Sequence, residues 1–282
     1  MIFDTITSDV WVPTTAPGHH YLYNHSASST YQANGSYFNS PYVAGILSGD
    51  VLRIGDLELS GQFFGEATDT SRENPSAKFD GFFGLGFDAT SQALVETPLH
   101  HMMHQGALDR KMFSVYIGRN GNPGELMLEG YDSNWFKGEL IYMNTASPVA
   151  WDVWLDKIQV GGLSISDGTA VTTSTMAVFV FGLSEKVSRF AEKLGGKEEL
   201  PGSGVYSIDC AADPPDVTFV VDGHPFSISK VDYILPIMDE KCLLAFVGGI
   251  PSWILGTAVL RKFYTVFDMD GKAPRIGLAM AT

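Results

Sequence analysis

Short apolar runs separated by turn residues recur along the whole chain and limit most strongly what it can fold into. The runs are rich in Val, Ile, Phe and Tyr and are bounded by Gly, Asn and Asp, as in GQFFGEA, MFSVYIG, GELIYMN, DVTFVV and KFYTVFD. Such runs predict β-strands. Only two stretches have the apolar spacing of a helix, about residues 93–105 and 184–193, and Ser184 is the expected N-cap of the second. The sequence therefore predicts an all-β fold with few short helices.

The chain also carries a weak internal repeat. In the first half, Asp-Thr-Ile at residues 4–6 is followed by Phe-Phe-Gly at 82–84; in the second, Ser-Thr-Met at 174–176 is followed by Ile-Leu-Gly at 254–256. With 282 residues, the chain is long enough for two lobes of roughly 140 residues that each bury a core. NTASPV near residue 145 interrupts the strand pattern, so we predict lobes over residues 1–145 and 146–282.

Composition and charge exclude two classes of partner. The formal charge is -14 and only 18 residues are Lys or Arg, which argues against nucleic acid because phosphate binding needs clustered basic residues. No run approaches the roughly 18 apolar residues of a membrane-spanning helix. We therefore predict a globular protein, expected to be a monomer, that binds neither nucleic acid nor membrane.

The cysteines and two glycosylation sequons bear on the compartment. Cys210 and Cys242 are the only cysteines, and their spacing is unlike that of a zinc ribbon. They form either a single disulfide or two free core thiols. Asn24-His-Ser and Asn34-Gly-Ser are sequons close together in a polar stretch, which makes Asn24 and Asn34 glycosylation candidates and favours a secretory route. We predict a secreted protein or one in a vacuolar or lysosomal compartment.

Several motifs resemble one known family. Phe3-Asp4-Thr5, followed by Trp-Val-Pro at 11–13, is similar to the first active-site segment of the pepsin-like aspartic peptidases, and FDGFFGLGF at 79–87 and ILGTAVLRKFYTVFD at 254–268 agree with the same family. The resemblance implies a bilobal fold of two related β-barrel-like lobes with a peptide-binding cleft between them. It also implies the disulfide between the two cysteines, and a hairpin before Asp4 that has no counterpart in the sequence.

The family's chemistry requires one aspartate from each lobe. One carboxylate acts as a base on a water molecule while the protonated partner hydrogen-bonds the substrate carbonyl, and no metal or other cofactor takes part. Asp4 matches the first aspartate. By its spacing from Gly182, Ser174 falls where the second is expected. Asp167 is the only nearby substitute, and Asp167-Gly168-Thr169 is interpreted as a β-turn instead.

The residues around the two turns depart from the family in part. Thr5 and Thr175 keep the threonines that brace the turns, but the turn glycines are replaced by Ile6 and Met176. A glycine in such a turn allows a close approach that a side chain prevents. These changes predict too little room for a catalytic water.

The flap segment of the family gives a further expectation. Counting back from Gly-Ile-Leu at 45–47 places Phe38 at the family's flap tyrosine, with Tyr37 and Tyr42 as alternatives if the alignment shifts. Trp11 matches a tryptophan that supports the flap side of the cleft. With Phe38 in this position, the flap hydroxyl is lost.

Three functions remain open on the sequence. The first is a catalytically inactive homologue whose cleft binds peptides. The second is an active acid endopeptidase that uses Asp4 with an unusual partner. The third is a scaffold, inhibitor or storage protein that acts through its surface. A zinc site at His100 and His104, four residues apart on a predicted helix, is disfavoured because no third ligand follows at useful spacing.

Overall fold

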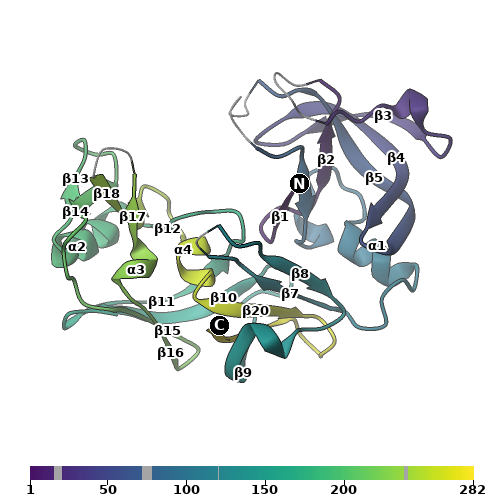
Figure 1. The fold of residues 1–282 in the computed structure, drawn as a ribbon. Coiled ribbons are helices and arrows are strands. Elements are labelled where there is room, and N and C mark those ends of the chain that lie inside the picture. Colours follow the sequence, from purple (N-terminus) through teal and green to yellow (C-terminus); the bar gives the residue numbers. More distant parts are fainter. Residues whose placement is uncertain (16–20, 72–77, 120, 238–240) are drawn as a thin grey trace. The chain divides into compact units, whose positions relative to one another are not determined.

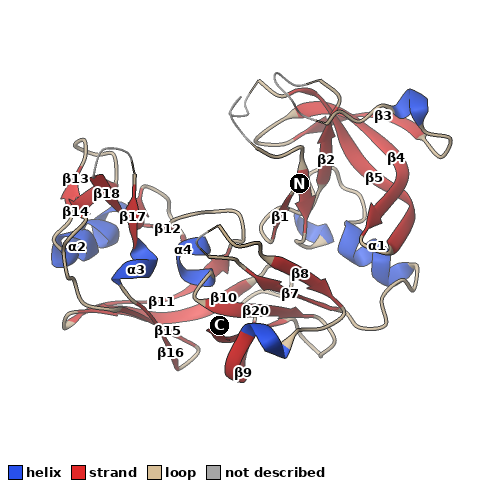
Figure 2. Ribbon diagram, viewed as in Figure 1, coloured by secondary structure: helices blue, strands red, loops and turns tan. Residues whose placement is uncertain are grey.

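The computed structural model describes residues 1–15, 21–71, 78–119, 121–237 and 241–282. The chain divides into two compact units, Met1–Asp109 and Arg110–Thr282, coloured purple to blue and teal to yellow in Figure 1. Strands account for most of the regular structure, and the helices are few and short (Figure 2). The predicted all-β fold with few short helices is confirmed. Within the described residues, none of the helices has the length and apolar character needed to cross a bilayer.

The first unit is built on a six-stranded sheet with the strand order β1-β6-β2-β5-β4-β3. Its strands are β1 (Ile2–Asp4), β2 (Val10–Pro13), β3 (Gln32–Asn39), β4 (Ala44–Ile54), β5 (Leu57–Asp69) and β6 (Phe82–Gly84). The helical segments are η1 (His25–Ala27), η2 (Asp88–Thr90) and α1 (Pro98–His104). β6 lies between β1, to which it is parallel, and β2, to which it is antiparallel. Since β1 and β3 are at the ends of this order, they are the edge strands.

The second unit contains a ten-stranded and a five-stranded sheet. The strands of the larger sheet are β10 (Asp152–Val160), β11 (Leu163–Thr173), β12 (Val180–Gly182), β13 (Lys197–Glu198), β14 (Val205–Asp209), β15 (Val217–Val221), β16 (His224–Ile228), β17 (Ile234–Pro236), β18 (Lys241–Gly248) and β19 (Trp253–Leu255). The smaller sheet has the order β8-β7-β20-β21-β9. It consists of β7 (Met112–Tyr116), β8 (Glu125–Leu128), β9 (Phe136–Asn144), β20 (Phe263–Asp268) and β21 (Arg275–Ala281), and η3 (Ser133–Trp135) precedes β9. The helices are α2 (Ser184–Leu194), α3 (Lys230–Tyr233) and α4 (Thr257–Leu260).

Three aromatic side chains join the two sheets of the second unit. Phe113 of β7 stacks on Phe267 of β20 with ring centroids 4.7 Å apart, and Trp151 meets both rings edge-on. All three are fully buried. The segment from 110 to 145 therefore belongs to this unit, because its strands pair with the C-terminal strands β20 and β21. This is why the compact units divide at residue 109, whereas the repeat and the NTASPV segment predict lobes that divide at residue 145.

The two predicted helices exist, but their N-termini differ from expectation. The first begins at Pro98 instead of near residue 93, because a proline holds the preceding residue extended, and Thr97 has φ -72° and ψ 156°. In the second, Ser184 is the first helical residue and Leu183 is the N-cap, so the prediction of a serine cap is wrong. Burial of Val187, Phe190, Ala191 and Leu194 on one face stabilises this helix instead.

Two further sequence predictions concern the second unit. Asp167-Gly168-Thr169 is not a β-turn: it lies within β11, where the pairing with β10 shifts register in a β-bulge.

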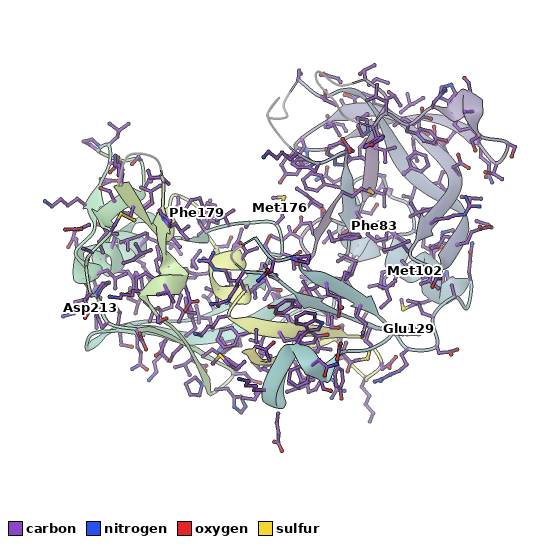
Figure 3. All side chains as sticks on the ribbon, in the orientation of Figure 1. Phe83, Met102, Glu129, Met176, Phe179 and Asp213 are labelled. Carbon is purple, nitrogen blue, oxygen red and sulfur yellow. A yellow bond between two sulfur atoms is a disulfide. The ribbon has the colours of Figure 1, made fainter. Side chains whose placement is uncertain are left out.

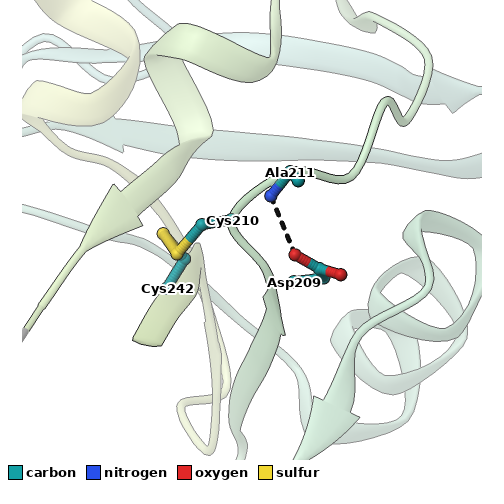
Figure 4. The surroundings of a disulfide bond; sticks show 4 residues. All are labelled: Asp209, Cys210, Ala211 and Cys242. Atoms are coloured by element: carbon teal, nitrogen blue, oxygen red, sulfur yellow. Dashed lines mark hydrogen bonds between the residues drawn. A yellow bond between two sulfur atoms is a disulfide. The ribbon is translucent and has the colours of Figure 1, made fainter. Parts of the chain in front are cut away.

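Cys210 and Cys242 form a disulfide with a Cα to Cα distance of 5.2 Å, next to Asp209, whose carboxylate accepts from the Ala211 amide (Figure 4). The predicted bridge is confirmed, and the alternative of two free thiols is wrong.

A buried carboxylate on β4 holds a neighbouring loop of the first unit. Asp50 accepts hydrogen bonds from the hydroxyls of Tyr23, at 2.6 Å, and Thr30, at 2.5 Å, and from the Val51 amide at 2.7 Å. Burial alone would raise the pKa of Asp50, but the hydrogen bonds, led by those from Thr30 and Tyr23, outweigh it and lower the pKa from 3.8 to about 2. The ionised form of Asp50 therefore stabilises the folded state.

We expect Asp50→Asn to destabilise the protein at mildly acidic pH. A carboxyl whose pKa is lower in the folded state than the unfolded value of 3.8 stabilises the fold above that value and loses this effect as pH falls toward about 2. The difference in unfolding free energy between wild type and Asp50→Asn, about 2 kcal/mol near pH 6, should shrink as pH falls from about 4 to about 2. Urea titrations across this range measure it. Asp56→Asn, which changes an exposed carboxyl in the β4 to β5 turn, is the control; a constant difference for Asp50→Asn would contradict the prediction.

Candidate active site

Asp4 ends the edge strand β1 and begins a tight turn. Its side chain is buried, with 1% of the residue exposed. One carboxylate oxygen accepts from the Ile6 amide at 3.2 Å and the other from the Thr7 amide at 3.1 Å. Its own carbonyl accepts from the Leu85 amide at 2.8 Å. The Asp4 carboxylate thus organises the turn by satisfying two backbone donors that no strand partner reaches.

Ser174 occupies the matching turn of the second unit. It directly follows β11, is fully buried, and its hydroxyl accepts from the Met176 amide at 3.3 Å and the Ala177 amide at 2.9 Å. Its own amide donates to the Leu255 carbonyl at 2.9 Å. Met176 is labelled in Figure 3 on the loop that leaves this turn. In both turns the acceptor bonds the amides two and three residues ahead, so serine reproduces with one oxygen what Asp4 does with two.

The strands around the two turns have the same topology. β1 is parallel to β6 with Asp4 opposite Gly84, and β11 is parallel to β19 with Thr173 opposite Leu255, which puts Ser174 level with Gly256. β2 then returns antiparallel to β6, as β12 does to β19. Both glycines allow a close backbone crossing: a Cβ would lie 2.3 Å from the Ser8 carbonyl carbon at Gly84, and 2.3 Å from the Phe179 carbonyl oxygen at Gly256. The weak sequence repeat corresponds to this shared arrangement.

The other predicted turn residues lie around the two acceptors. Thr5 is buried, and Thr175 and Met176 are half-buried. Ile6 is 38% exposed. Its side chain lines a cavity of about 170 Å³ in the first unit, so the space beside the Asp4 turn contains an apolar group.

Neither Phe38, the predicted flap residue, nor its alternative Tyr37 lines the cavity beside the Asp4 turn. Phe38 is 1% exposed and packs on β5, where a Cβ at Gly65 would lie 2.3 Å from its ring. Tyr37, its neighbour on β3, points to solvent and is 74% exposed. Both are therefore poor candidates for a flap residue. The alternation of side chains along a strand explains their opposite directions.

Tyr42 is the tyrosine that lies beside Asp4. The Ser40 amide donates to the Val43 carbonyl at 2.8 Å, and this tight turn presents Tyr42 at the tip of the β3 to β4 hairpin. The Tyr42 ring stacks on Phe82 at 5.0 Å, and Phe82 also stacks with Trp11 at 5.2 Å. Burial, and to a lesser extent the charge of Asp4, raises the pKa of the Tyr42 phenol. The sequence offered Tyr42 only as an alternative, because the length of the hairpin turn could not be read from it.

The cavity beside the Asp4 turn is lined by residues of the first unit only. Its walls include Ile6, Thr7, Asp9, Trp11, Tyr42 and Gln92. Asp9, which the sequence analysis did not single out, fixes the far wall by accepting from the Ser91 hydroxyl at 2.7 Å and the Gln92 amide at 2.8 Å. With a tryptophan, a tyrosine and an isoleucine among its walls, the cavity suits an apolar side chain.

Two of the α1 histidines, His100 and His104, contact carboxylates. His100 lies 2.6 Å from Asp88, and His104 contacts Glu96. Among the residues that the structure describes, no three His, Cys, Asp or Glu side chains are grouped so that they could hold a metal ion. Both imidazoles are thus in contact with a carboxylate of the first unit.

Comparison with known proteins agrees with this geometry. The family model described as "Eukaryotic aspartyl protease" matches residues 1–281. The chain belongs to this family. Among its relatives, vacuolar protease A of Aspergillus fumigatus is 35% identical, and the match covers 100% of this chain and 75% of that protein. Cathepsin E of Oryctolagus cuniculus is 34% identical, and the match covers 100% of this chain and 76% of that protein. Renin of Rattus norvegicus is 32% identical, with 100% of this chain and 75% of that protein covered.

The hydrogen bonds of Ser174 predict that its side chain stabilises the folded state. Ser174→Ala removes the side-chain acceptor of the Met176 and Ala177 amides, and a buried donor that loses its partner costs about 1 to 3 kcal/mol. We expect a loss of this size in urea unfolding. Ser203→Ala is the matched control, because Ser203 also accepts from an amide two residues ahead but is exposed, so its loss should be below about 0.5 kcal/mol. Equal stability of the two variants would contradict the role of Ser174.

Proposed function

We propose that this aspartyl protease homologue binds peptides without cleaving them. The observation that carries the proposal is Ser174, which has the same backbone partners in its turn as Asp4 has in the other. Aspartic peptidase chemistry needs one carboxylate to take a proton and one carboxylic acid to donate one. A serine hydroxyl does not ionise in the pH range of this chemistry, so it cannot share a proton with Asp4 as a second carboxyl would.

The two residues that follow the turn threonines support the same proposal. Ile6 and Met176 stand where the family resemblance implies glycines, and the Ile6 side chain lines the cavity next to the Asp4 turn. A branched side chain there reduces the space for a water held by Asp4. Restoring the missing carboxyl alone would therefore leave two further obstacles to hydrolysis.

Peptide binding is supported by the cavity of the first unit. Its walls combine an aromatic stack, Trp11-Phe82-Tyr42, with the polar groups of Thr7 and Asp9. Such a pocket accepts an apolar side chain while main-chain hydrogen bonds hold the rest of an extended peptide, and neither interaction needs a catalytic pair. The disulfide and the similarity to a protein named vacuolar protease A support a vacuolar, lysosomal or secretory location.

A second candidate function is acid endopeptidase activity that depends on Asp4. The observation that favours it is the retained Asp4 itself, buried and fixed by two backbone amides. This function requires an unusual second proton donor in place of Ser174. The two candidates differ in whether the unmodified protein cleaves a peptide bond.

Activity assays with restored residues distinguish these candidates. We expect no cleavage of a denatured protein substrate by the wild type between about pH 2 and about pH 7. The triple variant Ile6→Gly, Ser174→Asp, Met176→Gly should gain cleavage that pepstatin inhibits and that a further Asp4→Ala change abolishes. Wild-type cleavage that Asp4→Ala removes would favour the endopeptidase, and a folded but inactive triple variant would count against Ser174 as the position of the second carboxyl.

Binding assays test the proposed pocket separately. Tyr42→Ala removes one face of the aromatic stack, so we expect an extended apolar peptide to bind about tenfold more weakly, which corresponds to about 1.4 kcal/mol. Tyr37→Ala, a change of the same kind at an exposed position on β3, should leave affinity unchanged. Fluorescence polarisation with a labelled peptide measures both. Equal affinities for the two variants would exclude Tyr42 from the binding surface.

A further inference from the structure

The sequon at Asn34 lies at an irregular point of the edge strand β3. The pairing of β3 with β4 shifts register between Ala33 and Tyr37, and Asn34, Gly35 and Ser36 fall inside this shift. All three residues are exposed. β3 has a neighbour on one side only in the sheet order, so reagents and enzymes can reach this segment.

The local geometry favours a reaction of the Asn34 side chain with its own backbone. The Asn34 carboxamide oxygen accepts from the Ser36 amide at 3.0 Å, which folds the side chain back over the following peptide group and brings Cγ toward the Gly35 nitrogen. The same hydrogen bond polarises the carbonyl that would be attacked. Gly35 has φ +76°, and a Cβ there would meet nothing within 4 Å, so no side chain hinders the approach.

We propose that Asn34 is a modification site at which N-glycosylation and spontaneous deamidation compete for one amide. In deamidation, the Gly35 nitrogen loses its proton and bonds to Cγ of Asn34. The bond from Cγ to Nδ2 breaks, and ammonia leaves with that proton. Water then opens the five-membered succinimide at either carbonyl, which gives aspartate or isoaspartate. No oxidant, reductant or other co-reactant takes part.

A glycan on Nδ2 slows this reaction because the group that must leave is then a bulky glycosylamine and not ammonia. Without the glycan, deamidation adds one negative charge to a chain whose formal charge is -14 and places it on an exposed edge strand. Charges at such an edge oppose pairing with a strand of another molecule, as a bulky glycan does. Either modification therefore protects the same edge.

Asn24 provides an internal control. Its side-chain oxygen accepts from the Ser26 amide at 3.1 Å, so the carboxamide is folded back in the same way. The next residue, however, is His25, whose ring stacks on Tyr31 at 4.9 Å and lies 2.9 Å from the Glu66 carboxylate. This anchored side chain restricts the approach of the His25 backbone nitrogen to Asn24. Asn24 therefore belongs to a sequon of the same kind, but we expect it not to deamidate.

The first experiment uses protein from a bacterial host, in which sequons are not glycosylated. After incubation at neutral pH, peptide mapping by mass spectrometry should find residue 34 converted to a mixture of aspartyl and isoaspartyl forms, with one oxygen taken from heavy-oxygen water, while Asn24 is unchanged. Conversion should be slower at acidic pH and at least severalfold slower in Gly35→Asp, since aspartate tolerates the left-handed backbone of this position. Conversion of Asn24 at the same rate, or an unchanged Asn34 while a free peptide of residues 30–38 deamidates, would overturn the proposal.

The second experiment tests the competition in a eukaryotic secretory host. An endoglycosidase that leaves one N-acetylglucosamine marks every glycosylated asparagine without converting it to aspartate. In wild type, Asn34 should carry this sugar and resist deamidation. Ser36→Ala, which destroys the sequon but keeps Asn34, Gly35 and the backbone amide of residue 36, should lack the sugar and deamidate. A wild-type protein whose Asn34 is unglycosylated, or one that deamidates as fast as Ser36→Ala, would overturn the competition.

Discussion

Both halves of this fold depend on the same interaction. In each, a buried side chain accepts hydrogen bonds from two backbone amides of a tight turn. In each unit a short strand runs parallel to a second one and then turns sharply, and the turn leaves amides that no strand can satisfy. Asp4 serves the amides of Ile6 and Thr7, and Ser174 serves those of Met176 and Ala177. A hydroxyl oxygen has two acceptor lone pairs, so one serine can accept from both amides, although each bond is weaker than one to a carboxylate. The turn can therefore lose its carboxyl and keep its structure, so the structural and the catalytic requirements at residue 174 are separable.

Close packing surrounds both turns. Gly84 and Gly256 let the strands cross at distances that no side chain would allow, and the neighbouring strands follow the same order in both units. In the first unit, the aromatic stack of Trp11, Phe82 and Tyr42 fixes the hairpin tip beside the Asp4 turn. The walls of the cavity beside this turn do not depend on a carboxyl at residue 174, which is the physical basis for the proposed peptide binding.

The sequence predicts much of this fold because strands leave a regular pattern of apolar residues between turns. It fails where a tertiary or neighbouring interaction overrides the local pattern. Thr97, held extended before Pro98, delays the start of α1; the expected serine cap of α2 is absent because burial of one face suffices; and the predicted turn at Asp167-Gly168-Thr169 is absorbed into β11 as a bulge. Each failure concerns a short polar or proline-containing segment, for which several conformations have similar local energies.

Part of the candidate site can be predicted from residue spacing in the sequence, and part of it is seen only in the folded structure. Spacing from Gly182 predicts Ser174 as the residue of the second turn, and the structure gives its hydroxyl turn hydrogen bonds like those of Asp4. Spacing puts Phe38 at the flap position, but the hairpin turn at Ser40 to Val43 decides which aromatic ring lies beside the Asp4 turn. Hydrogen bonds of both the Ser40 backbone and the Ser40 hydroxyl hold that turn. Phe38 is consequently part of the core and Tyr42 is beside Asp4. With the Tyr42 phenol beside Asp4, the absence of a flap hydroxyl expected from Phe38 does not count against catalysis, and the proposal that this chain does not cleave peptides rests on Ser174, Ile6 and Met176.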